Sequence, residues 1–144
     1  MNNELRLIKK LKINMKLDNK MRVIIDGRKV KSKNDFLKIM EESFLFPESC
    51  HGNLDIFMDY IRDLSWINHS KIELIVKNQS DFLRDDQNLR DMIIECFQEE
   101  ILPYWQKEVL ETMVHGKCKE FSVFLVDEQI IQVGKKKKEY PVTE

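Results

Sequence analysis

Three aspartates with helical spacing are the residues of this sequence whose types and positions best suit chemistry. Asp55, Asp59 and Asp63 stand four residues apart in the segment GNLDIFMDYIRDLSW. At 100° per residue they share an arc of about 80°, opposite an apolar face. Like charges at this spacing repel by about 0.2–0.5 kcal/mol per pair. A helix that keeps three of them indicates a surface that displays negative charge to a partner.

A second candidate helix repeats the arrangement. Asp91, Glu95 and Glu99 lie opposite another apolar face. The simpler alternative for both stripes is a solvated helix face. Arg62 favours that alternative for the first stripe, because it follows Asp59 by three residues and can pair with it. The sequence alone leaves both interpretations open.

A metal or acid–base site is a weaker interpretation of the same helix. His51, Asp55 and Asp59 are spaced to share one helix face. The sequence offers no further convergent ligand and no nucleophile with an activating group beside it. We therefore expect neither enzymatic activity nor a cofactor.

The charge of the chain is segregated along its length. All 144 residues together have a formal net charge of −1. Residues 1–38 carry twelve Lys/Arg and four Asp/Glu, residues 39–134 carry eight and nineteen, and the last ten residues carry four and two. The resulting charges are +8, −11 and +2. An acidic body of this kind suits a basic partner and speeds its capture.

Cysteine usage and hydropathy indicate a cytoplasmic protein. The three cysteines are odd in number and lack redox or metal-ligand spacing, which is typical of free thiols in a reducing compartment. No signal peptide is expected, because no apolar core of about 7–15 residues follows the first charges. No apolar run approaches the ~20 residues that span a bilayer. The length favours a single domain, which we expect to be monomeric before it meets a partner.

Hydrophobic periodicity predicts alternating strands and helices. Strands are expected at residues 11–17, 21–26, 71–78, 121–126 and 129–133. Helices are expected at residues 35–43, 53–64, 88–102 and 103–114. Ser32 or Asn34 can cap the first helix, and Asn53 can cap the second. This order predicts a small parallel sheet with helices packed on it.

Five segments in this order carry a family likeness: VIIDGRKVKSKNDFLKIM, FPESCHGNLDIFMDYIRDLSW, KIELIVKN, IIECFQEE and FSVFLV. The block P-E-x-x-x-x-N-L-D-x-x-x-D, followed by a tryptophan and placed after a strand–turn–helix segment, is fairly specific. In these segments, over residues 21–127, the sequence resembles the barstar family of ribonuclease inhibitors. Residues 1–20 form a basic extension, expected to be a strand, and residues 128–144 form a second extension with a lysine-rich tail.

The resemblance implies an α/β fold, with a small three-stranded parallel sheet flanked by helices. The two extensions can add edge strands to this sheet. It also implies that a loop and the second helix plug a ribonuclease active site, with carboxylates replacing RNA phosphates. In that case the protein is a bacterial immunity protein against a basic ribonuclease toxin, without membrane contact and with no expected nucleic-acid contact.

The resemblance also implies which residues contact the ribonuclease. Asp55 and Asp59 match the principal acidic contacts, Trp66 matches an aromatic after that helix, and Glu99 matches an acidic contact on the later helix. The remaining expected partner-binding residues are Ser49, His51, Asn53, Met58 and Asp63.

The sequence departs from the family pattern in the same region. Ser49 and Cys50 stand where the family often has aromatics, and Met58 replaces a frequent tryptophan. These departures concern the identity of the target more than the mode of inhibition.

Two other functions remain open from the sequence. A regulatory domain with the same fold can bind a partner that is not a nuclease. An RNA-binding protein can act through its basic ends, residues 1–20 and 135–144.

Overall fold

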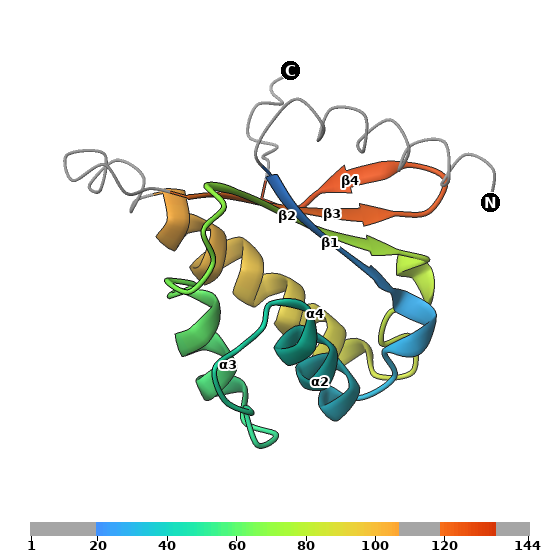
Figure 1. Cartoon of the computed structure of the whole chain (residues 1–144). Helices are drawn as coiled ribbons and strands as arrows, with labels where there is room; N and C mark the ends of the chain where they lie inside the picture. The colour runs from blue at the N-terminus through green and yellow to red at the C-terminus, as the bar shows by residue number, and fades with distance from the viewer. Residues whose placement is uncertain (1–19, 107–118, 135–144) are drawn as a thin grey trace.

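A four-stranded sheet with helices packed on one face forms the fold (Figure 1). This computed structural model describes residues 20–106 and 119–134. The strands are β1 (Lys20–Asp26), β2 (Lys71–Lys77), β3 (Glu120–Val126) and β4 (Ile130–Gln132). They lie in the order β1-β2-β3-β4, with β1, β2 and β3 parallel and β4 antiparallel to β3.

Three α-helices connect and cover these strands. They are α2 (Lys33–Ser43), α3 (Leu54–Ile61) and α4 (Gln87–Cys96). Short 3₁₀ turns follow the first two strands: η1 (Gly27–Lys29) and η2 (Gln79–Asp81). A π-helical turn, η3 (Phe97–Ile101), extends α4, and helical backbone continues over residues 102–106.

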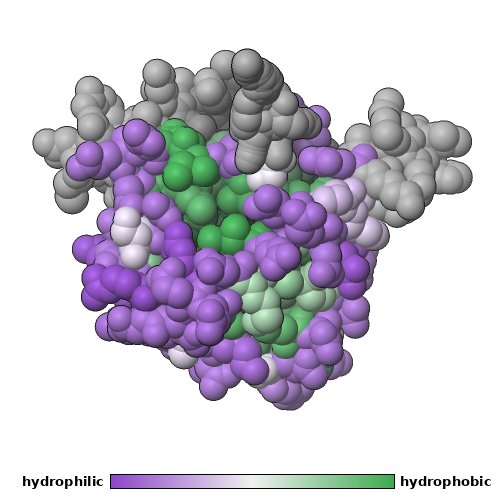
Figure 2. Space-filling model, turned by 180° about the vertical axis from the view of Figure 1, so that it is seen from behind, coloured by the Kyte–Doolittle hydropathy of each residue, from purple (hydrophilic) through white to green (hydrophobic). Residues whose placement is uncertain are grey.

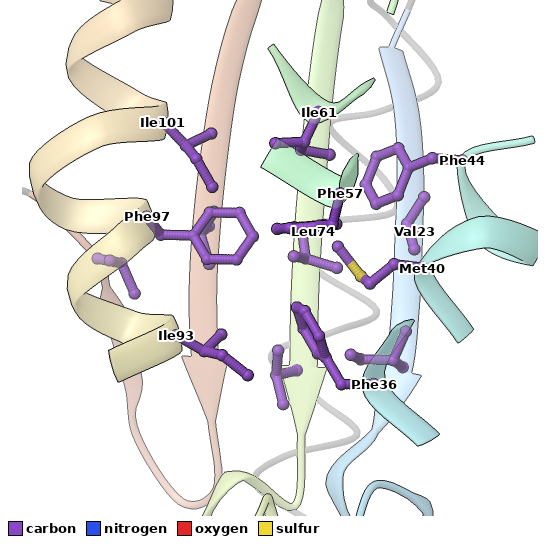
Figure 3. Close-up of a cluster of buried hydrophobic side chains, with 14 of the residues drawn as sticks. Val23, Phe36, Met40, Phe44, Phe57, Ile61, Leu74, Ile93, Phe97 and Ile101 are labelled. Atoms are coloured by element: carbon purple, nitrogen blue, oxygen red, sulfur yellow. The ribbon is translucent and has the colours of Figure 1, made fainter. Parts of the chain in front are cut away.

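Alternating residues of the three parallel strands build the core. Val23, Leu74 and Val123 lie opposite one another in the strand register, and all three are buried. Helix side chains converge on this row from α2, α3 and the α4–η3 helix. Figure 3 shows Phe36, Met40, Phe44, Phe57, Ile61, Ile93, Phe97 and Ile101 arranged around it.

Two of the intervening strand positions carry opposite charges. Arg22 of β1 lies opposite Glu73 of β2 in the register, and its Nη2 atom is 3.0 Å from a Glu73 carboxylate oxygen. Lys20 approaches the other oxygen of the same carboxylate at 3.2 Å. These cations balance the charge of Glu73, which is buried in the middle strand.

The predicted fold class is confirmed. The three parallel strands occur where the periodicity placed them, and β4 adds an edge strand from the C-terminal extension. The strand expected at residues 11–17 and the lysine-rich tail lie outside the described residues. Most of the helix expected at residues 103–114 lies outside them as well.

The helix that follows the second strand differs from the prediction. A break was expected before Pro103, but the helical backbone runs through it. Proline lacks an N–H, and its ring clashes with the carbonyl four residues back in a regular α-helix. The π turn ahead of it changes the register, and Leu102 donates its N–H to the Phe97 carbonyl, five residues back. We attribute the continuous helix to this wider turn.

Candidate partner-binding surface

The short helix α3 carries the two aspartates that the sequence singled out first. Its start is capped as predicted, because the Asn53 side chain accepts a hydrogen bond from the Asp55 N–H at 2.7 Å. Phe57 and Ile61 are buried against the sheet and the other helices. Asp55 and Asp59 therefore project from the opposite side, and the Asp59 side chain is 80 % exposed.

The end of α3 comes earlier than the sequence predicted. The helix stops at Ile61, and the Asp63 N–H bonds to the Tyr60 carbonyl at 2.9 Å in the following turn. Leu64 then adopts a left-handed conformation with φ of 48°. Asp63 is exposed beyond the helix, where its carboxylate accepts from the Ser65 N–H at 3.3 Å. The stripe thus consists of two helical aspartates and a third in a turn.

Two side chains satisfy carbonyls at this helix end, which have no partner within the helix. Arg62 donates from Nε to the Met58 carbonyl at 3.0 Å. The indole N–H of Trp105 donates to the Ile61 carbonyl at 3.0 Å, in a buried contact. Trp105 thus ties α3 to the helical segment that follows η3. These bonds hold the exposed face of α3 in a defined place.

Arg62 also approaches the second aspartate of the stripe. Its Nη2 atom lies 3.7 Å from an Asp59 carboxylate oxygen. The predicted pairing three residues apart is confirmed, at the long end of the range for an ion pair. Asp59 therefore has a nearby counter-ion and remains open to solvent.

The loop before α3 is held by a carboxylate from α2. One oxygen of Glu41 accepts the Cys50 N–H at 2.7 Å and the Ser49 hydroxyl at 3.2 Å. The Ser49 hydroxyl oxygen in turn accepts the His51 N–H at 3.0 Å. His51 and Gly52 then turn the chain with φ of 51° and 73°. We call residues 44–66, which comprise this loop, α3 and the turn after it, the α3 surface.

Sequence reasoning missed Glu41. A glutamate near the C-terminal end of a helix is disfavoured by the helix dipole, which prefers cations there. That unfavourable position was the available signal that this side chain has another partner. The partner itself could not be predicted, because the loop brings Ser49 and Cys50 back to α2 only in the folded chain.

Cys50 has a structural role in this loop. Its side chain is fully buried. Burial, together with the charge and hydrogen bond of Glu41, raises the pKa of the Cys50 thiol to about 11. The thiol is therefore protonated at neutral pH and packs as a small apolar group.

Trp66 belongs to an aromatic cluster that supports the loop. Its indole N–H donates to the Phe44 carbonyl at 2.8 Å. Its ring meets Phe46 and Tyr60 edge to face, with centroids 6.0 and 5.8 Å apart. Trp66 is half-buried, and its polar atom is used internally.

Met58, which was expected to be a partner-binding residue, is almost completely buried. Its side chain is only 9 % exposed and belongs to the hydrophobic core. On a helix as short as α3, packing reaches the flank of the apolar face as well as its centre. The position of Met58 leaves little of it available to a partner.

Glu99 lies on the neighbouring π turn. Phe97 packs on Phe57 with ring centroids 6.2 Å apart, which places η3 beside α3. Glu99 itself is exposed, as are Asp91 and Glu95 on α4. The second acidic stripe, formed by Asp91, Glu95 and Glu99, is therefore a solvent-facing surface on the helix that packs beside α3.

The outer surface is mostly polar. Figure 2 shows hydrophilic residues over most of the face seen from behind, with hydrophobic residues near its centre. The large hydrophobic side chains that are exposed among the described residues are Leu45, Met92 and Ile131.

The described residues contain neither a cluster of metal ligands nor a membrane-spanning helix. No group of three or more His, Cys, Asp or Glu residues there could hold a metal ion. No helix of residues 20–106 and 119–134 combines the length and apolar character needed to cross a membrane.

Comparison with known families agrees with this geometry. The family described as Barstar (barnase inhibitor) matches residues 21–122. No curated protein and no solved structure matches the chain. The matched range contains all of β2, β1 without its first residue and the first three residues of β3, together with the α3 surface and η3. The chain therefore belongs to the barstar family of barnase inhibitors.

Proposed function

We propose that this protein inhibits a basic ribonuclease by covering its active site with the α3 surface. The observation that carries the proposal is the exposed pair Asp55 and Asp59, on one side of a capped helix within the family match. Carboxylates in this arrangement can occupy the positions that RNA phosphates take in the enzyme. The protein performs no chemical step itself.

The two aspartates have distinct places in this proposal. Asp59 contacts arginine and histidine side chains of the ribonuclease through charge-assisted hydrogen bonds. Asp55 adds a second contact one turn earlier. Ser49, His51 and Asn53 shape the rim of the α3 surface on the side of the loop.

Preorganisation supports tight binding by this surface. The Glu41 carboxylate holds the loop, and the Asn53 cap holds the start of α3. Arg62 and Trp105 hold its end. A binding surface that is ordered before association loses less conformational entropy when the complex forms.

The proposed setting is the cytoplasm of a bacterial cell that makes or encounters a toxic ribonuclease. There the protein acts as an immunity protein and binds the toxin as a monomer. This setting rests on the family's known role, since a fold alone does not determine a function.

Substitution of Asp59 tests the proposal. Barnase and a panel of other basic microbial ribonucleases are titrated with the wild-type protein, Asp59→Ala and Asp85→Ala, and RNA cleavage is followed. We expect Asp59→Ala to raise the inhibition constant by roughly 30-fold or more, because a charge of the enzyme loses its partner. Asp85 is exposed in the turn before α4, so Asp85→Ala is the matched control and should match the wild type.

The same experiment distinguishes the other functions. Wild-type protein that inhibits no member of the panel contradicts the ribonuclease proposal and favours a partner that is not a nuclease. RNA binding that weakens with salt and disappears when residues 1–20 and 135–144 are removed would instead identify an RNA-binding protein.

A further inference from the structure

Arg62 is the one basic side chain in a long acidic stretch. Residues 39–70 contain six Asp/Glu and a single Lys/Arg, and that residue follows Asp59 by three positions. A surface that only had to attract a basic enzyme would gain from a neutral residue there. The position of this cation therefore needs its own explanation.

Helix capping explains only part of the Arg62 side chain. The Nε–H bond to the Met58 carbonyl satisfies the end of α3, which a neutral donor could do as well. The two Nη groups make no hydrogen bond to the described residues, and the side chain is 36 % exposed. They lie beside Asp59, with Nη2 at 3.7 Å from its carboxylate. Arg62 thus presents unused donors and a positive charge next to the proposed contact residue.

We propose that Arg62 determines which ribonuclease the α3 surface accepts, an inference that rests on the function proposed above. A cation of the enzyme that reaches Asp59 comes close to the Arg62 guanidinium, and like charges at that separation repel. The repulsion is offset when the enzyme also brings a carboxylate or carbonyl oxygen to the Nη groups. Arg62 therefore selects enzymes that have such an acceptor beside their cationic pocket and rejects those with cations alone.

The test compares affinities across several enzymes. Dissociation constants are measured for barnase and the other basic ribonucleases with the wild-type protein, Arg62→Gln, Arg62→Met and Arg62→Lys. We expect both neutral variants to lose at least tenfold in affinity for the best-bound enzyme and to gain about threefold or more for poorly bound ones. Arg62→Lys keeps the charge and should keep the wild-type ranking, that is, the order of the enzymes by their dissociation constants. Using two neutral variants keeps the test valid if one of them is unstable.

Arg84→Gln is the matched control, because Arg84 pairs with Asp81 at the same three-residue spacing and 3.0 Å, away from the α3 surface. This variant should leave every dissociation constant within twofold of the wild-type value. A loss of helix stability at Arg62 would weaken binding to all enzymes by one common factor. A common factor, or no change, in the neutral Arg62 variants overturns the inference.

The outcome for Asp59 separates this inference from the proposed function. If Asp59→Ala abolishes tight inhibition while Arg62 variants keep the ranking, only the role of Arg62 is wrong. If the wild-type protein binds no ribonuclease in the panel, the proposed function and the inference both fail.

Discussion

At the scale of single residues, the shape of the α3 surface depends on side chains that lie outside residues 44–66. Glu41 is the clearest example, because one of its oxygens accepts hydrogen bonds from both Cys50 and Ser49. The backbone that leads into α3 is positioned by this carboxylate on α2. Mutations at Glu41 should therefore affect both stability and inhibition.

Replacement of Glu41 by alanine removes the acceptor of a partly buried N–H. We expect Glu41→Ala to lower the free energy of unfolding by about 1–3 kcal/mol, because an N–H left without an acceptor loses solvation without compensation. Glu41→Gln keeps an acceptor oxygen and should lose less. Urea denaturation measures the difference.

The neighbouring Glu42 provides the control for Glu41. It is exposed on the same turn of α2, so Glu42→Ala should leave the unfolding free energy within about 0.5 kcal/mol of the wild-type value. Equal losses in the Glu41 and Glu42 variants would show that the contact with Cys50 does not hold the loop.

At the scale of elements, the end of α2 contains a conformational strain that substitution can relieve. Leu45 follows the helix cap with φ of 55°, and its side chain is 66 % exposed. The Phe46 N–H bonds back to the Glu41 carbonyl at 3.0 Å, which is the bond expected of a Schellman motif. Glycine is the residue that usually occupies this left-handed position.

Leu45→Gly should stabilise the protein by up to about 1 kcal/mol. The left-handed conformation costs about 1–2 kcal/mol for a residue with a Cβ, and glycine avoids this cost. Part of the stabilisation is lost again, because glycine has more conformational freedom in the unfolded chain and loses it on folding. Leu45→Ala keeps the Cβ and should give no such gain. A glycine variant that melts below the alanine variant would contradict this account.

The sequence could predict those parts of these elements that depend on residues close together in the chain. The start of α3 was predictable, since an asparagine cap acts on the next residues of its own chain. Its end was not, because it depends on a left-handed leucine at position 64. The burial of Met58 and the Glu41–Cys50 bond depend on contacts between separate segments. Periodicity within one segment carries no information about such contacts.

The same distinction applies to the candidate site. The pairing of Arg62 with Asp59 was predictable from a spacing of three residues on one helix. The use of the Trp66 indole N–H by the Phe44 carbonyl was not, because 22 residues separate them. The roles of the surface residues in binding remain predictions.

At the scale of the whole molecule, the separation of charge along the chain predicts how the protein would meet a basic partner. The 96 residues from 39 to 134 carry a net charge of −11 within a chain whose total is −1. A field of this sign draws a basic protein toward the acidic body over distances that salt can screen.

Association with a ribonuclease that the protein inhibits should therefore be fast and sensitive to salt. We expect the association rate constant to fall about tenfold or more between ~50 and ~500 mM NaCl, while the dissociation rate constant changes less. Stopped-flow mixing measures the first quantity, and competition with labelled enzyme measures the second. An association rate constant that is independent of salt would exclude electrostatic steering.

The hydrogen bonds that shape the α3 surface have a consequence for how such proteins diversify. The bonds of Glu41 to Cys50, Asn53 to Asp55 and Phe44 to Trp66 all close within residues 41–66. Apart from the Trp105 bond to Ile61, the hydrogen bonds described for the α3 surface therefore lie within one uninterrupted peptide of 26 residues, encoded by one short stretch of gene. If the proposed function is correct, we expect recombination confined to that stretch to exchange one target for another while the strands, the α4 helix and Trp105 keep their sequences.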